Sequence, residues 1–327
     1  MAEMRWHPLI KDWVMIASHR QGRPQMPKDW CPFCPGSGRV PEDYDVLEYD
    51  NDFPALSQNP PRPDDVATDF FKVRPAYGKC EVILYSPKHT VTLPELSVPH
   101  IEKLVNLWIE RFEAMRQDEK IKYIFIFENR GEAVGVTMPH PHGQIYGYPE
   151  IPKKLQLELQ SSGEYYEEHK KCLFCDMIKA ERNFEKRIIF ENNSFMVFLP
   201  FFTEYPYGVY IISKRHLTYI NQFTAEEKTD FADVLQKTTG MLDSLFGYKF
   251  PYMMCMHNGP VNSGDCSDYF HFHVEFFPPM RSENQQKFNA SSETGVWAHC
   301  NPTAPEDKAV ELKEALKRFI VADDKRS

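Results

Sequence analysis

Three residues in the run His140-Pro141-His142-Gly143-Gln144 carry groups that could act on a phosphate ester. In an extended chain, positions 140, 142 and 144 point to the same side, so two imidazoles and one amide share a surface. Pro141 has no N–H to give to a sheet, which places the run at a strand end or sheet edge that a ligand can reach. A neutral imidazole near its usual pKa of about 6.5 is a good nucleophile toward phosphorus. We therefore predict that His142 attacks a phosphate ester, with Gln144 and Asn129 donating hydrogen bonds to its oxygens.

Four of the eight cysteines form two CxxC pairs, and each pair is followed by histidines at corresponding places. Zinc prefers a tetrahedral set of sulfur and nitrogen ligands, and a CxxC turn delivers two thiolates to one ion. We predict two zinc ions per chain with structural roles, because binding of this kind is coupled to folding. The predicted ligands are Cys31, Cys34, His89 and His140 for the first site, and Cys172, Cys175, His216 and His271 for the second.

The order of these groups occurs twice along the chain, which predicts a tandem duplication. Each copy has a CxxC pair, an apolar run, a Ser-Pro-Lys-His or Ser-Lys-Arg-His run, a helix pattern, a strand pattern and a His-x-His pair. We place the first half, which carries the nucleophile, at residues 1–150, and the second half, which carries the second metal site, at residues 151–327. The stretch from about 145 to 171 is the expected connector.

The elements that must position these groups follow from the spacing of apolar residues. Apolar residues at helical spacing predict helices from Ile101 to Met115, from Thr224 to Leu245 and after Pro305. The second of these helices opens with a capping box, Thr224-Ala225-Glu226-Glu227. Aromatic and branched residues predict strands over 123–127, 195–199 and 270–276. Strands outnumber helices and do not alternate strictly with them. We therefore expect an α+β fold of mainly antiparallel sheets with helices packed on one face.

The second half carries His273-Val274-Glu275 where the first carries His142-Gly143-Gln144. A glutamate repels a phosphate where a glutamine donates to it. We therefore expect that the second half has lost catalysis and that His273 has a structural role.

The composition indicates which kinds of ligand or partner this protein can bind. The 327 residues carry a formal net charge of -9, so there is no basic excess to replace the counterions of a nucleic acid. The first residues lack the apolar core of a signal peptide, and no run of eighteen apolar residues follows. We expect a soluble cytoplasmic protein that binds a small anionic ligand, with neither nucleic acid nor membrane as a partner.

The run Glu128-Asn129-Arg130-Gly131 followed by the His140–Gln144 motif resembles the transferase branch of the histidine-triad superfamily. The resemblance to the galactose-1-phosphate uridylyltransferase family extends over essentially the whole chain. It implies two histidine-triad-like units and a nucleotidyltransferase of galactose metabolism, a UDP-glucose–hexose-1-phosphate uridylyltransferase. UMP would pass from UDP-glucose to galactose 1-phosphate through a covalent uridylyl group on His142, with Asn129 and Gln144 holding the α-phosphate. The hydrolases of the superfamily usually have a third histidine where this chain has Gln144.

The same resemblance implies where the substrates bind. Three segments match the family's arginine-bearing, uridine-binding and hexose-binding stretches. These segments supply Arg20 and Arg23 for phosphate or nucleotide contacts, Asn51, Asp52 and Phe53 for uridine, and Lys287, Phe288 and Glu293 for the hexose. It also implies a homodimer whose active sites borrow residues across the interface, from Arg23 or from the segment near Lys287.

Several points stay open at the sequence level. Some relatives hold their second metal with a glutamate and three histidines, which correspond to Glu158, His257, His271 and His273, and this site could hold a metal other than zinc. We prefer the cysteine-containing set because it mirrors the first half. Which side chain from Val136 to Pro139 contacts the phosphate is also open. The alternatives for function are an adenylyltransferase similar to ADP-glucose phosphorylase, a nucleotide hydrolase, and a non-catalytic zinc-stabilised nucleotide-binding protein. The sequence does not decide the sugar epimer.

Overall fold

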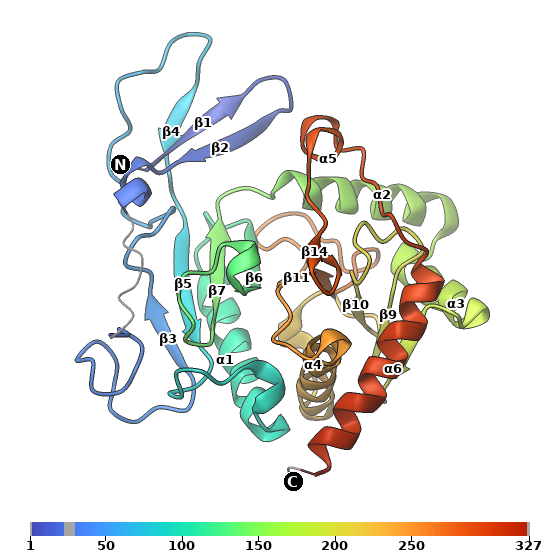
Figure 1. The fold of residues 1–327 in the computed structure, drawn as a ribbon. Coiled ribbons are helices and arrows are strands. Elements are labelled where there is room, and N and C mark those ends of the chain that lie inside the picture. The colour runs from blue at the N-terminus through green and yellow to red at the C-terminus, as the bar shows by residue number, and fades with distance from the viewer. Residues whose placement is uncertain (1, 23–29, 326–327) are drawn as a thin grey trace.

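The computed structural model describes residues 2–22 and 30–325, and its strands form one large sheet and two small ones (Figure 1). In spatial order the nine strands of the large sheet are β3 (Leu47–Asp50), β5 (Lys79–Leu84), β7 (His142–Tyr148), β6 (Tyr123–Arg130), β11 (Tyr252–His257), β12 (His273–Phe277), β10 (Tyr210–Ser213), β9 (Phe195–Phe198) and β8 (Ile188–Glu191). The small sheets contain β1 (Glu3–His7), β2 (Asp12–Ile16) and β4 (Val73–Pro75), and β13 (Met280–Ser282) with β14 (Gln285–Gln286).

The helices pack against the large sheet or lie in its connections. The α-helices are α1 (Val98–Arg116), α2 (Lys153–His169), α3 (Leu173–Phe184), α4 (Ala225–Phe246), α5 (Ser291–Val296) and α6 (Pro305–Asp323). Short 3-10 turns are η1 (Ser18–Gly22), η2 (Leu93–Glu95), η3 (Glu132–Val134) and η4 (Ile220–Gln222). No helix among the described residues is long and apolar enough to span a bilayer.

The order of strands in the large sheet shows the duplication directly. Reading outward from the centre, β6, β7, β5 and β3 of the first half match β11, β12, β10 and β9 of the second. The two halves meet where β6 pairs antiparallel with β11, from Ile126 opposite Met256 to Arg130 opposite Tyr252. The pairings among these nine strands are all antiparallel. The predicted α+β class, with antiparallel sheets in two similar halves, is confirmed.

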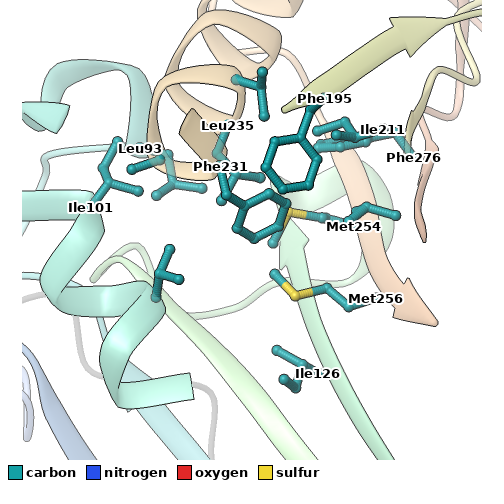
Figure 2. Close-up of a cluster of buried hydrophobic side chains, with 14 of the residues drawn as sticks. Leu93, Ile101, Ile126, Phe195, Ile211, Phe231, Leu235, Met254, Met256 and Phe276 are labelled. Atoms are coloured by element: carbon teal, nitrogen blue, oxygen red, sulfur yellow. The ribbon is translucent and has the colours of Figure 1, made fainter. Parts of the chain in front are cut away.

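The main hydrophobic core lies between one face of the sheet and the helices α1, α4 and α6. Figure 2 shows the part of this core that lies between α1, α4 and the sheet. Alternate residues of β9 divide between the two faces, as the period of a strand requires. Phe195 and Val197 enter this core, whereas Met196 and Phe198 pack against α2 and α3 on the opposite face. Helices therefore cover parts of both faces, rather than one face only as expected, because the strands of the second half are apolar on both sides.

The sequence patterns locate the long helices but miss α2. The α1 stripe predicted from Ile101 to Met115 is fully buried, and Thr224 accepts a hydrogen bond from the Glu227 N–H in the predicted capping box at α4. The stretch expected to be a connector is largely helix α2, which buries only two residues and so gives little periodic signal. The strand expected over 270–276 begins only at His273, because the Phe272 N–H donates to the carbonyl of Leu217.

Candidate active site and metal centres

The predicted nucleophile, His142, is the first residue of β7 and lies half-buried where this strand begins beside β5 and β6. Its Nδ1 lies 2.8 Å from the main-chain carbonyl oxygen of His140. A carbonyl can only accept, so Nδ1 carries the proton and the lone pair is on Nε2. This hydrogen bond fixes both the tautomer and the direction of the ring. Sequence could not have identified it, because the acceptor is a main-chain group two residues earlier.

A small polar cavity adjoins His142 and brings the three predicted catalytic residues together. Its volume is about 50 Å³, and it is lined by Asn129, Gly135, Val136, Thr137, Met138, His142 and Gln144. Gly135 takes a left-handed conformation, with φ of 81°, which turns the loop after η3 over the cavity. Thr137 contributes the only hydroxyl side chain in this lining, and so becomes our candidate for the phosphate contact that the sequence left open.

A second cavity, of about 360 Å³, shares Gln144, His142 and Met138 with the first and is also lined by the predicted uridine-binding residues. Its lining is Trp30, Pro32, Phe33, Arg39, Tyr49, Asn51, Asp52, Phe53, Val82, Met138, His142 and Gln144. Asn51 accepts the Phe53 N–H at 2.9 Å, and its Nδ2 lies 3.5 Å from Gln144 Oε1. Aromatic side chains with a few convergent polar groups are the usual composition of a nucleoside pocket.

Sequence reasoning missed several residues of this second cavity. Arg39 pairs with Asp52 at 2.7 Å, so it sets the orientation of a predicted uridine-binding carboxylate. Phe33 lies between the CxxC cysteines, and its ring centroid is 6.0 Å from that of His142. The position of Phe33 inside a predicted metal loop was the one available signal, since a loop tied to His140 must also lie near His142.

The other predicted substrate-binding residues do not all lie near the cavities at His142. Arg20 lies in η1, where its Nη1 is 3.5 Å from the Tyr146 hydroxyl, which in turn is 3.1 Å from Gln144 Oε1. Arg23 falls outside the described residues. Lys287 and Glu293 lie 3.6 Å apart, away from the two cavities described above, and Phe288 is 72% exposed. Within the described part of one chain, the predicted hexose-binding segment is therefore not brought to His142.

The predicted ligands of the first metal site come together as one cluster. Cys31, Cys34, His89 and His140 each offer a ligand atom within 4.8 Å of the others. The Cys34 Sγ lies 3.3 Å from Nδ1 of His89 and 3.7 Å from Nδ1 of His140. Sulfur and nitrogen ligands of one tetrahedral zinc ion would be separated by about 3.6 Å, so the donor set fits that ion.

Hydrogen bonding and burial around this cluster support the same geometry. His140 Nε2 donates to the Ser86 carbonyl at 2.8 Å, which leaves Nδ1 facing the thiols. Burial raises the pKa of Cys31 to about 11 and lowers that of His140 to about 4. Burial therefore favours the neutral thiol and the neutral imidazole, and a bound cation would favour the thiolate.

The second predicted site has the same construction. Cys172, Cys175, His216 and His271 form one cluster, with the Cys175 Sγ 3.4 Å from Nδ1 of His216 and 3.6 Å from Nδ1 of His271. His271 Nε2 lies 2.8 Å from the Ser213 carbonyl, as His140 Nε2 lies from Ser86. The structure thus groups His271 with the cysteines, and not with the alternative ligands Glu158 and His257.

The alternative ligands form a third cluster, in which Glu275 takes the place considered for His271. Glu158, His257, His273 and Glu275 lie together near the interface of the halves, and His257 Nδ1 is 3.0 Å from Glu158. Lys154 Nζ contacts Glu275 and compensates part of the negative charge. Burial by itself raises the pKa of Glu158, but the opposing effect of the nearby His257 charge leaves that pKa below its usual value. The cluster is therefore partly balanced by its own charges, and its donor set also suits a metal ion.

Comparison with known proteins decides the family. Residues 1–152 match the family described as galactose-1-phosphate uridyl transferase, N-terminal domain, and residues 158–310 match its C-terminal domain. The chain belongs to the galactose-1-phosphate uridylyltransferase family. The galactose-1-phosphate uridylyltransferase of Thermotoga maritima is 42% identical over 315 residues, which cover 96% of this chain and 98% of that protein. The Saccharomyces cerevisiae enzyme of the same name is 34% identical, over 87% and 86% of the two chains.

Solved structures agree with this assignment. A structure described as that of a uridylyltransferase is 34% identical, with a TM-score of 0.90 over 97% of this chain and 99% of that one. An ADP-glucose phosphorylase from Arabidopsis thaliana has a TM-score of 0.75 at 24% identity, over 96% and 99% of the two chains, and shows likeness of fold alone. The protein is an enzyme of the transferase class.

Proposed function

We propose that this protein transfers UMP from UDP-glucose to galactose 1-phosphate, with His142 carrying the uridylyl group between the two substrates. The observation that carries the proposal is the position of His142. Its Nδ1 is held by a main-chain carbonyl, and His142 lines both a small polar cavity and an aromatic cavity. A phosphate in the first and a uridine in the second would present the α-phosphorus to Nε2. Family membership supplies the substrates.

Two displacements complete the reaction. Nε2 of His142 forms a bond to the α-phosphorus, the bond from that phosphorus to the bridging oxygen breaks, and glucose 1-phosphate leaves with the electron pair. A phosphate oxygen of galactose 1-phosphate then attacks the same phosphorus and releases Nε2. The Nδ1–H bond to the His140 carbonyl disperses the positive charge that develops on the ring in each step. Asn129 and Gln144 would donate to the non-bridging oxygens.

The proposal extends to metals and assembly. We assign a structural zinc ion to each Cys2His2 cluster, where it would link the CxxC loop to the strand end that carries the His-x-His pair. The eight cysteines, which all lie in the described part of the chain, are free thiols, in keeping with metal ligation in a reducing cytoplasm. A homodimer would bring the segment near Lys287 of one subunit to His142 of the other, since one chain does not unite them.

The deciding experiment is the intact mass of the protein after mixing with UDP-glucose or ADP-glucose, without acceptor and without acid quenching. One uridylyl adduct is expected, located on the peptide of His142 and not on that of His273, and discharged by galactose 1-phosphate. His142→Ala should form none, whereas His169→Ala, on the exposed end of α2, should react as the wild type does. An adenylyl adduct instead would move the assignment to an ADP-glucose phosphorylase. No adduct with either nucleotide sugar would reject the covalent mechanism.

A further inference from the structure

The space beneath Gly143 is occupied by the hydroxyl group of Tyr85. A Cβ added at Gly143 would lie 2.2 Å from the Tyr85 Oη and 3.0 Å from the Phe127 carbonyl oxygen. Only glycine fits here, one residue after His142 and one before Gln144. In the second half the corresponding residue is Val274, whose side chain is buried in the main core. In the half that carries Glu275, the residue at this position therefore leaves no room for a hydroxyl group.

The main chain of Tyr85 also holds the segment on the other side of the nucleophile. Its N–H donates to the Pro141 carbonyl at 3.0 Å, one residue before His142. Its own carbonyl accepts from His100 Nε2 at 2.7 Å, and its ring packs edge-on against Trp108, both residues of α1. Tyr85 thus contacts the chain immediately before and immediately after His142, and connects both contacts to a helix of the main core.

Buried charged groups lie behind the Tyr85 hydroxyl. Glu128 is 94% buried and accepts a hydrogen bond from the Tyr252 hydroxyl at 3.2 Å, while Arg130 pairs with Asp243 at 2.7 Å. Burial, and then the nearby Glu128 charge, hold the pKa of Tyr85 well above its usual range, so its hydroxyl keeps its proton. Glu128 Oε2 and the Tyr85 hydroxyl have no partner of ordinary hydrogen-bond geometry among the described residues.

These groups line a cavity that reaches the nucleophile. The cavity has a volume of about 360 Å³, and its lining includes Tyr85, Glu128, Arg130, Asn129 and His142. A cavity of this size, with polar groups in its lining, is roomy enough for bridging water, which could satisfy the buried atoms that lack protein partners. The cavity therefore joins the buried charges behind β6 to the residues that face the substrate.

We propose that Tyr85 is a positioning residue that fixes the His142 segment for attack on the α-phosphorus. This inference rests on the proposed function of His142. A displacement of about 1 Å in reacting groups can lower a rate by roughly a hundredfold. A contact that locks the chain on both sides of His142 therefore acts on the rate of attack, and leaves the binding of the nucleotide sugar largely unchanged.

The test compares two buried tyrosines that lose the same oxygen. Tyr85→Phe is matched by Tyr123→Phe, because the Tyr123 hydroxyl is also fully buried and without a partner among the described residues, but lies at the far end of β6. Removing such a hydroxyl costs little stability, so both variants should unfold at the wild-type temperature. The rate of uridylyl-His142 formation from UDP-glucose should fall about tenfold or more in Tyr85→Phe, with unchanged Kd, and stay within about twofold in Tyr123→Phe.

A second measurement asks whether residues 143 and 85 act through one contact. Gly143→Ala should slow adduct formation strongly, and should slow it by a smaller factor in the Tyr85→Phe background, where the clashing oxygen is gone. Equal rates for Tyr85→Phe and Tyr123→Phe, or strictly independent effects of the 143 and 85 changes, would overturn the inference. Failure of the wild type itself to form an adduct would instead reject the proposed function.

Discussion

At the scale of single residues, the two halves differ most sharply at Gln144 and Glu275. Gln144 lines both cavities at His142, with its Oε1 3.1 Å from the Tyr146 hydroxyl. Glu275 accepts from the Tyr210 hydroxyl at 2.5 Å and contacts Lys154, so its charge is held by neighbours. A phosphate beside Glu275 would meet a carboxylate, whereas beside Gln144 it can meet an amide donor.

This contrast predicts the effect of Gln144→Glu. The new carboxylate keeps the size of the side chain but removes a donor and adds repulsion, so uridylyl transfer should slow by about a hundredfold or more. Steady-state kinetics would measure the loss, with Gln160→Glu on the exposed face of α2 as the control. A Gln144→Glu enzyme with near wild-type kcat would show that Gln144 does not contact the phosphate.

Glu128 gives a second prediction at this scale, on stability against pH. Burial raises its pKa from the ordinary value of 4.5 to about 7, with Arg130 opposing the rise. Between these values the folded protein holds a proton that the unfolded chain releases. The free energy of unfolding therefore falls as pH rises from about 4.5 to about 7, and Glu128→Gln should remove this loss.

Urea unfolding at pH 5 and pH 8 would measure the effect. Relative to the wild type, Glu128→Gln should be more stable at pH 8 than at pH 5 by about 3 kcal/mol. The comparison cancels other titrating groups, because both proteins carry them. A difference between the two proteins that is the same at both pH values would contradict the raised pKa.

At the scale of elements, two glycines inside helices allow the effect of helix propensity on stability to be distinguished from the effect of side-chain packing. Replacing glycine by alanine inside a helix should stabilise it by about 1 kcal/mol from propensity alone. At Gly163 of α2 the new Cβ would lie 3.8 Å from Tyr269, an ordinary contact, whereas at Gly240 of α4 it would lie 2.2 Å from the Phe319 ring of α6. Gly163→Ala should therefore raise the free energy of unfolding, and Gly240→Ala should lower it by about 1–3 kcal/mol.

Thermal and urea unfolding of the two variants would check this pair. The wild-type α6 would have to move away from α4 for Gly240→Ala to be tolerated, and the contact between these helices is part of the main core. If both variants stabilise the protein, the Phe319 ring does not pack against Gly240 closely enough to exclude a Cβ atom.

The elements that the sequence predicted are those with a strong period and a clear cap. The α1 stripe and the α4 capping box are local signals, and the structure has both helices where these signals place them. The repeated order of motifs predicted two similar halves, although not that the β6–β11 pairing joins them into one sheet. Helix α2 escaped detection because it buries little, and the division at residues 150 and 151 remains a prediction.

In the candidate site, too, some features could be predicted from the sequence and others could not. Cysteine and histidine spacing predicted both four-residue clusters, because metal ligands are recognised by type and order. The His140 carbonyl, Tyr85 and Arg39 carry no such signature, since a main-chain acceptor, a buried tyrosine and a paired arginine occur throughout proteins. Their roles follow only from contacts between residues far apart in sequence.

At the scale of the whole molecule, metal content tests three clusters at once. We expect two zinc ions per chain, one lost in Cys34→Ala and the other in Cys175→Ala. Because zinc binding of this kind is coupled to folding, removing both ions should lower the unfolding temperature by roughly 10 °C or more. Elemental analysis after a mild chelator wash would give the count. A third equivalent that disappears in His257→Ala would assign a metal to the cluster of Glu158, His257, His273 and Glu275 as well.

Assembly is the largest feature that one chain leaves incomplete, because the predicted hexose-binding segment lies away from His142. If a homodimer with two-fold symmetry supplies that segment from the partner, an inactive His142→Ala chain and an inactive Glu293→Ala chain can complement one another. A mixed dimer would contain one site with an intact His142 and an intact Glu293. Random pairing of equal amounts makes half of the dimers mixed, so about a quarter of the wild-type activity should return. The chains are to be unfolded and refolded together, with separately refolded chains as the control. Activity that stays absent in mixtures whose dimers have demonstrably exchanged would place the whole site within one chain.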